Sequence, residues 1–101
     1  DTWIGENVLI GHMCIIHGAR LENRAFIGMG SVVLDGAVVE AGAMLAAGGI
    51  LTPRKRIPSG QLWGGNPAKF MRDLRPEEPS MHADMVEGYV QLGIKHAASL
   101  T

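Results

Sequence analysis

Cysteine, aromatic residues and excess charge are all scarce in this chain of 101 residues. The single cysteine, Cys14, excludes an internal disulfide framework and fits a reducing compartment. Nine Lys and Arg against ten Asp and Glu give a formal net charge of -1, which provides no basic footprint for nucleic acid or for a membrane surface. The longest apolar run, Ala41 to Leu51, has eleven residues, fewer than the roughly 18 that a membrane span needs. We therefore expect no nucleic-acid partner and no membrane partner.

A core that is poor in aromatic side chains has to be built from aliphatic ones. Aromatic residues make up 5% of the chain, whereas 47% is hydrophobic and 14 residues are glycine. Aliphatic residues recur through the first sixty positions at Ile4, Ile10, Ile16, Leu21, Ile27, Val33, Val39, Leu45, Leu51 and Ile57. Every interval is six residues except the five from Ile16 to Leu21. Because a period of six matches neither a helix nor a strand, it predicts units of one short strand and one tight turn, three to a triangular coil.

Such units predict a mainly β fold, a left-handed parallel β-helix over residues 1–63. Each recurring aliphatic residue is expected to point inward and to stack on its equivalents about 4.7–4.9 Å away in the coils above and below. The next residue is often glycine, as at Gly5, Gly11 and Gly28. We expect it to allow the corner, through a positive φ or a close backbone approach. An ordinary β-meander with glycine turns is the alternative.

The repeat ends after Gly60, and residues 64–101 predict an exit turn and a C-terminal helical segment of the same domain. Asn66 and Pro67 are typical of the N-cap and first position of a short helix that reaches about Leu74. Ser80 is a suitable cap for a second helix to about Ala98. Its apolar stripe consists of Met81, Met85, Tyr89, Leu92 and His96. We expect this α-helix to pack alongside the outer wall of the coils.

The repeat is already in phase at Ile4, with no capping element before it. An uncapped coil exposes a row of unpaired backbone groups. We therefore expect the chain to be a fragment that lacks its N-terminal coils. A naturally short chain capped by a partner is the alternative. The fragment alone is expected to aggregate and to be essentially inactive.

Two histidines five residues apart, His12 and His17, are the most informative polar residues of the repeat. Their hexad positions place them on adjacent wall strands, on either side of a corner, with outward side chains. Imidazole is a common zinc ligand, and catalytic zinc typically has three protein ligands and a water. The two rings are poorly placed to reach one ion within a subunit, but could do so if the outer faces of two subunits met. A pair of surface histidines is the alternative.

Three blocks of the sequence, residues 10–18, 26–36 and 55–69, resemble the gamma-class carbonic anhydrase family. The resemblance implies a homotrimer with metal sites at the subunit interfaces. It implies that His12 and His17 ligate the metal from neighbouring subunits, usually zinc, with another divalent metal such as iron or cobalt as the alternative. The activity implied is hydration of carbon dioxide to bicarbonate. The family's third histidine ligand, with an arginine and a glutamine of the site, would lie upstream of Asp1. The location implied is cytoplasmic, or mitochondrial in a eukaryote.

Other residues have weaker implications for the site. Tyr89 resembles a helix tyrosine that projects toward the metal pocket in relatives, and a packing role in the apolar stripe is its alternative. Cys14 occupies the small-residue position of its hexad, which favours a buried structural thiol over a ligand. The run from Arg54 to Arg56 is either a solvated loop or an attractant for an anion such as bicarbonate.

Three other functions stay open. A hexapeptide acyltransferase would use a histidine as general base without metal, and its family shares the Gly-x-Pro-Ala-Lys turn near residue 65. A thioesterase for coenzyme A conjugates could use the same metal chemistry as a hydratase. The third alternative is a non-catalytic structural homologue, which the missing upstream histidine would favour.

Overall fold

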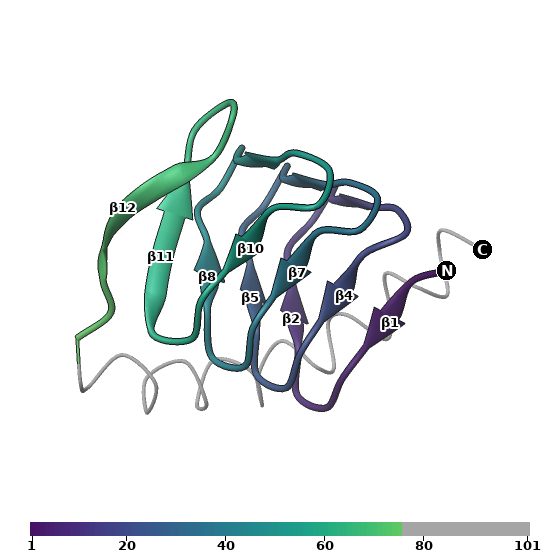
Figure 1. Ribbon diagram of the computed structural model, residues 1–101, viewed down its shortest axis with the longest axis horizontal. Coiled ribbons are helices and arrows are strands. Elements are labelled where there is room, and N and C mark those ends of the chain that lie inside the picture. Colours follow the sequence, from purple (N-terminus) through teal and green to yellow (C-terminus); the bar gives the residue numbers. More distant parts are fainter. Residues whose placement is uncertain (76–101) are drawn as a thin grey trace.

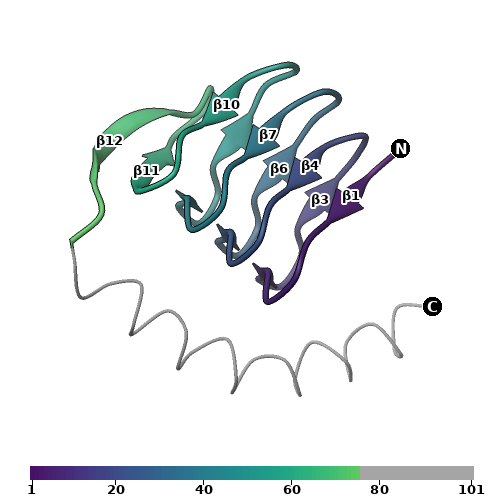
Figure 2. The same ribbon diagram turned by 60° about the horizontal axis from the view of Figure 1, so that its bottom comes forward.

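Short parallel strands stacked in coils form the part of this computed structural model that can be described, residues 1–75 (Figures 1 and 2). The two-residue strands are β1 (Trp3–Ile4), β2 (Leu9–Ile10), β3 (Ile15–Ile16), β4 (Arg20–Leu21), β5 (Phe26–Ile27), β6 (Val32–Val33), β7 (Val38–Val39), β8 (Met44–Leu45), β9 (Ile50–Leu51) and β10 (Arg56–Ile57). Two longer strands follow, β11 (Gln61–Gly64) and β12 (Lys69–Asp73). No helix is present within these 75 residues.

Every third strand belongs to the same sheet, so three sheets form the walls of the column. The first wall has the order β1-β4-β7-β10, the second β2-β5-β8-β11-β12, and the third β3-β6-β9. All pairings among β1 to β11 are parallel. The fold is therefore a β-solenoid of about three turns, and the β-meander alternative is wrong. The left-handed sense of the coil stays a prediction.

Strand register explains the single five-residue interval between Ile16 and Leu21. Ile4 pairs with Leu21 in the first wall, a separation of 17 residues, whereas Leu21 pairs with Val39 18 residues on. The first coil is thus one residue shorter than the next. The missing residue lies between Ile16 and Leu21, at the corner from the third wall to the first.

The recurring aliphatic side chains fill the interior of the column. From the second coil on they are completely buried, namely Leu21, Ile27, Val33, Val39, Leu45, Leu51 and Ile57. The one buried polar side chain among residues 1–75 is Ser31, whose hydroxyl donates to the Ala46 carbonyl at 3.0 Å. In the first coil Ile4 is 49% exposed, because only the coil on one side covers it. The predicted inward column is therefore confirmed for these residues.

Glycines after the inward aliphatic residue permit close stacking and do not provide the positive φ. In most corners the residue with a positive φ is the third after the inward aliphatic residue. These residues are Asn7, Met13, Arg24, Gly30, Gly36, Gly42, Gly48, Arg54 and Gly60. In the shortened corner it is Gly18, the second residue after Ile16. At Gly11 an added Cβ would be 2.7 Å from the backbone nitrogen of Met29. At Gly28 it would clash with the backbone of Ala47. Of the two expectations for these glycines, close approach is the one that the structure supports.

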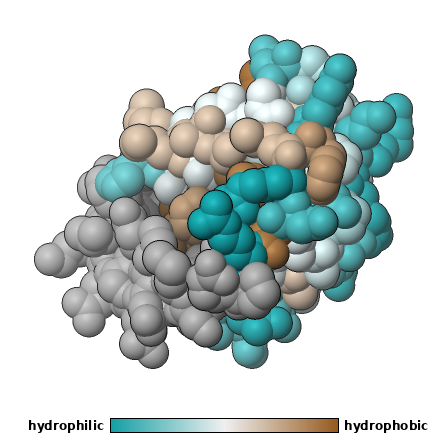
Figure 3. Space-filling model, turned by 90° about the vertical axis from the view of Figure 1, so that its left-hand side faces the viewer, coloured by the Kyte–Doolittle hydropathy of each residue, from teal (hydrophilic) through white to brown (hydrophobic). Residues whose placement is uncertain are grey.

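The short helix predicted after Pro67 is wrong. Residues 61–73 form an antiparallel hairpin, in which Leu62 faces Arg72 and Trp63 faces Phe70 across a β-bulge. The reason is tertiary: β11 would otherwise present an unpaired edge at the end of the column, and β12 supplies its hydrogen bonds. The side chains of β12 are exposed, and this end of the molecule shows mixed apolar and hydrophilic surface (Figure 3). The second predicted helix, from Ser80 to about Ala98, lies outside the described residues.

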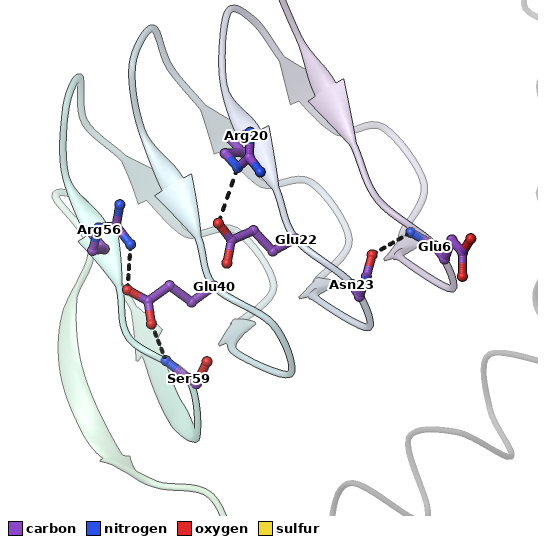
Figure 4. A network of polar contacts seen from close by, with 7 residues as sticks. All are labelled: Glu6, Arg20, Glu22, Asn23, Glu40, Arg56 and Ser59. Carbon is purple, nitrogen blue, oxygen red and sulfur yellow. Dashed lines mark hydrogen bonds and ion pairs between the residues drawn. The ribbon is translucent and has the colours of Figure 1, made fainter.

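Two ion pairs lie on the first wall, one within a coil and one between neighbouring coils (Figure 4). Arg20 Nε contacts Glu22 at 3.1 Å, and Arg56 Nη1 contacts Glu40 at 2.5 Å. The second carboxylate oxygen of Glu40 accepts from the Ser59 backbone N–H at 3.1 Å. The Arg20 guanidinium also lies over the Trp3 ring, 4.1 Å from its centroid. This face is therefore polar and internally paired.

The Glu40 contacts predict a pH-dependent contribution to stability. Hydrogen bonds from Arg56 and then from the Ser59 backbone lower the pKa of Glu40 below its ordinary value of 4.5. A lowered folded-state pKa stabilises the protein above the unfolded-state pKa, and the effect is lost as the pH falls through the folded-state value. We expect Glu40→Gln to lower the urea midpoint slightly at about pH 7 and to match the wild type at about pH 2. Arg56→Gln is the matched variant, and an equal deficit at both pH values would contradict the assignment.

Candidate metal centre

The two candidate ligands flank strand β3. His12 lies in the turn before this strand, next to Met13 with its φ of 60°, and His17 follows the strand directly. Both side chains are exposed. The expectation that the histidines lie on adjacent wall strands is wrong, because β2 and β3 have only two residues each and the third hexad position already belongs to the corner. One two-residue strand of the third wall separates them.

The ring of His17 is held by a carboxylate from the next coil. Its Nδ1 lies 2.5 Å from Oδ1 of Asp35. The backbone is fixed as well, because the His17 N–H donates to the Val33 carbonyl at 2.9 Å and the Gly18 N–H donates to Thr2 Oγ1 at 2.9 Å. With the carboxylate as acceptor, a neutral imidazole carries its hydrogen on Nδ1, and Nε2 is the nitrogen with a lone pair to offer.

Asp35 is the residue that the sequence reasoning missed. A signal was available, since Asp35 stands 18 residues after His17 in a fold with coils of about 18 residues. A carboxylate stacked one coil from a candidate histidine ligand is a typical partner for the ring nitrogen that does not bind metal.

Cys14 contacts backbone carbonyl oxygens through its thiol. Its side chain is half-buried against the core, and its thiol donates to the Gly28 carbonyl at 3.1 Å. A longer contact of 3.9 Å joins the thiol to the His12 carbonyl. These contacts support the structural reading of Cys14. Of the basic run, Arg56 is engaged with Glu40, and Arg54 adopts a positive φ at a corner.

The surface beside the histidines is apolar. Met13 is 84% exposed, Ile15 58% and Met29 59%. Ile15 belongs to the outer face of the third wall, where it pairs in register with the half-buried Val32. An exposed group of large apolar side chains next to polar functional residues is typical of an interaction surface.

Within one chain, His12 and His17 provide only some of the ligands that a zinc ion needs. Neutral imidazole is a preferred zinc ligand, and an Nδ1–carboxylate contact is common for zinc-binding histidines. Among residues 1–75, however, no three side chains of His, Cys, Asp or Glu come together. A complete site therefore needs ligands from outside this part of the chain. The candidate Tyr89, together with His82 and His96, lies outside the described residues.

No helix within residues 1–75 is long and apolar enough to cross a membrane.

Comparison with known proteins agrees with the coil architecture. The family model described as "Bacterial transferase hexapeptide (six repeats)" matches residues 1–34. Mitochondrial gamma carbonic anhydrase 2 of Arabidopsis thaliana is 50% identical over 97 residues, which cover 96% of this chain and 35% of the relative. Protein YrdA of Escherichia coli K12 is 43% identical over 88 residues, covering 87% of this chain and 48% of YrdA. The chain thus spans between about a third and a half of the length of these relatives.

A solved structure matches the fold as well. The hexapeptide transferase family protein from Anaplasma phagocytophilum superposes with a TM-score of 0.87 at 52% sequence identity. The match covers 91% of this chain and 55% of the other.

Proposed function

Because the chain belongs to the gamma carbonic anhydrase-like hexapeptide-repeat family, we propose that its assembled protein hydrates carbon dioxide to bicarbonate at a zinc site. His12 of one subunit and His17 of a neighbour supply two of the ligands. As the resemblance implies, we place the third ligand in sequence outside these 101 residues, and the chain spans 35% of gamma carbonic anhydrase 2. The observation that carries the proposal is the pair of exposed histidines on either side of β3, beside exposed apolar surface.

A closed homotrimer is the assembly that we propose. Cyclic assemblies bring two different surfaces of the same chain together at each interface, so one subunit can offer His12 where its neighbour offers His17. The exposed side chains of Met13, Ile15 and Met29 favour burial at such a contact. The proposal includes a left-handed coil and a C-terminal helix alongside it. It also includes a mitochondrial location in a eukaryote and a cytoplasmic one in a bacterium.

The residues of this chain have distinct parts in the mechanism. His12 and His17 hold the metal as neutral imidazoles, and the carboxylate of Asp35 orients the His17 ring. Apolar side chains around them exclude bulk water on assembly, which strengthens local electrostatic interactions. Tyr89 is proposed to project toward the pocket. When bound, zinc would lower the pKa of a water molecule to about 7, so that hydroxide would be available at neutral pH.

Acyl transfer is the second candidate function. It is favoured by the description of the Anaplasma phagocytophilum relative as a hexapeptide transferase family protein, at 52% identity. In that reaction a histidine acts as general base on a hydroxyl or amine, with no need for metal. A thioesterase or a non-catalytic structural subunit are the remaining alternatives.

Metal analysis combined with a hydration assay tests the proposal. We expect the natively assembled protein, purified without chelators, to contain about one zinc per subunit and to hydrate carbon dioxide. Removal of the metal should abolish hydration, and added zinc should restore it. Metal-free protein that transfers acetyl groups from acetyl coenzyme A would overturn the proposal in favour of the second candidate. Protein with neither metal nor either activity would favour the structural subunit.

A further inference from the structure

The shortened corner of the first coil places His17 and Asp35 in contact. Between the inward residues Ile16 and Ala19 this corner has only His17 and Gly18, whereas the next coil has Leu34, Asp35 and Gly36 between Val33 and Ala37. Backbone hydrogen bonds fix this alignment: the His17 N–H donates to Val33 O at 2.9 Å, and the Gly36 N–H donates to Gly18 O at 2.8 Å. Asp35 therefore stacks on Gly18 of the shorter corner, because the Gly36 N–H donates to Gly18 O in the same way as the Arg54 N–H donates to Asp35 O one coil on.

Gly18 leaves the space that the Asp35 side chain uses. A Cβ added at Gly18 would clash with the Asp35 carboxylate, and Gly18 also has a φ of +63°. The missing residue and the missing side chain thus act together. They allow the carboxylate of one coil to reach up to the imidazole of the coil before it, where Asp35 Oδ1 lies 2.5 Å from His17 Nδ1.

We propose that Asp35 is the positioning residue for His17, which it holds in the Nδ1–H tautomer with Nε2 directed away from the coil for metal binding. This inference rests on the proposed zinc site. The carboxylate fixes the ring rotation by accepting the Nδ1 hydrogen, and its negative charge makes Nε2 a better electron donor.

The exposure of both side chains indicates that the His17–Asp35 contact orients the imidazole ring and adds little to folding stability. The His17 and Asp35 side chains are 76% and 66% exposed. Ion pairs and hydrogen bonds at such exposed positions contribute little to stability, because solvent screens them. The core of the column lies elsewhere, in the buried aliphatic residues. Removal of the Asp35 carboxylate should therefore change the histidine while the fold stays intact.

Zinc affinity of the natively assembled protein provides the first test. Loss of a carboxylate partner of a ligating histidine typically weakens metal binding about 10- to 100-fold. We expect Asp35→Ala to raise the zinc dissociation constant by that factor in a chelator competition. Asp35→Asn should have a smaller effect, because its amide oxygen can still accept from Nδ1–H. Glu22→Gln is the control, since it removes a partly exposed carboxylate that is paired with Arg20 on the first wall, away from His17.

The tautomer of His17 provides a second readout that a merely structural residue would not change. In metal-free protein with 15N-labelled histidine, the wild type should show Nδ1–H at His17, and Asp35→Ala should shift the ring toward Nε2–H. An unchanged tautomer together with an unchanged zinc affinity would overturn the positioning role. If the wild type binds no zinc, or if His17→Ala binds it equally well, the proposed function fails instead. The tautomer shift still measures the Asp35 contact in that case.

Discussion

Replacement of His17 by alanine is expected to abolish zinc binding and carbon dioxide hydration together in the assembled protein. Zinc bound by four ligands gains about 10–16 kcal/mol in small zinc domains, which is roughly 2.5–4 kcal/mol for each ligand. Loss of one imidazole should therefore weaken zinc binding by on the order of a hundred- to a thousandfold. The fold should be unaffected, because the His17 side chain is exposed and its partner Asp35 is exposed as well. Zinc content after dialysis and the hydration rate measure the effect.

Trimers assembled from both variants test whether each zinc site is shared between two subunits. His12→Ala should have the same phenotype as His17→Ala, because each variant removes one ligand from every site. If neighbouring subunits contribute one histidine each, a trimer that contains both variants has one interface with both histidines intact. Random assembly of equal amounts should then recover about a quarter of the wild-type zinc sites and activity. His82→Ala, outside the blocks that carry the resemblance, is the control. No recovery on mixing, or full zinc content in His17→Ala, would contradict the shared site.

The column of coils was predictable from the sequence because the same requirement, burial of an aliphatic side chain, recurs at every inward position. Each inward position, such as Ile27 or Leu45, needs an aliphatic side chain to stack on its neighbours, so burial imposes the period directly on the residues. The five-residue interval after Ile16 was visible in the sequence, but only the strand register shows that one missing residue shortens the first coil in all three walls. Local pattern and global fold agree throughout these residues.

The parts that were predicted wrongly depend on contacts that no local pattern contains. Asn66 and Pro67 are typical of a helix start, yet β12 forms because β11 needs a hydrogen-bonding partner at the end of the column. The placement of His12 was missed because the strand length, two residues, cannot be derived from a period of six. Asp35 was missed because its partner His17 is distant in sequence, and only the stacking of coils brings them together.

Substitution of Gly28 by alanine is expected to destabilise the column far more than the same substitution at Gly48. At Gly28 the new Cβ would clash with backbone atoms of Ala46 and Ala47 in the next coil, which cannot move aside like the end of a side chain. At Gly48 nothing lies within 4 Å, and only its φ of +72° disfavours alanine. Overpacking typically costs 1–3 kcal/mol, and the rigid neighbours favour about 3 kcal/mol or more at Gly28. A left-handed backbone costs roughly 1–2 kcal/mol at Gly48.

The pair of variants separates the two uses of glycine in the repeat. Both replacements restrict the unfolded chain equally, so that effect cancels in the comparison. The chain itself shows that the positive φ is tolerated with a side chain, since Asn7, Met13, Arg24 and Arg54 adopt it at equivalent corners. No such tolerance is expected at Gly28, where the backbones of two coils meet. Urea unfolding of the assembled protein, followed by far-UV circular dichroism, measures both losses. Equal losses, or a larger loss at Gly48, would show that corner geometry and not the close approach of the coils determines where glycine is required.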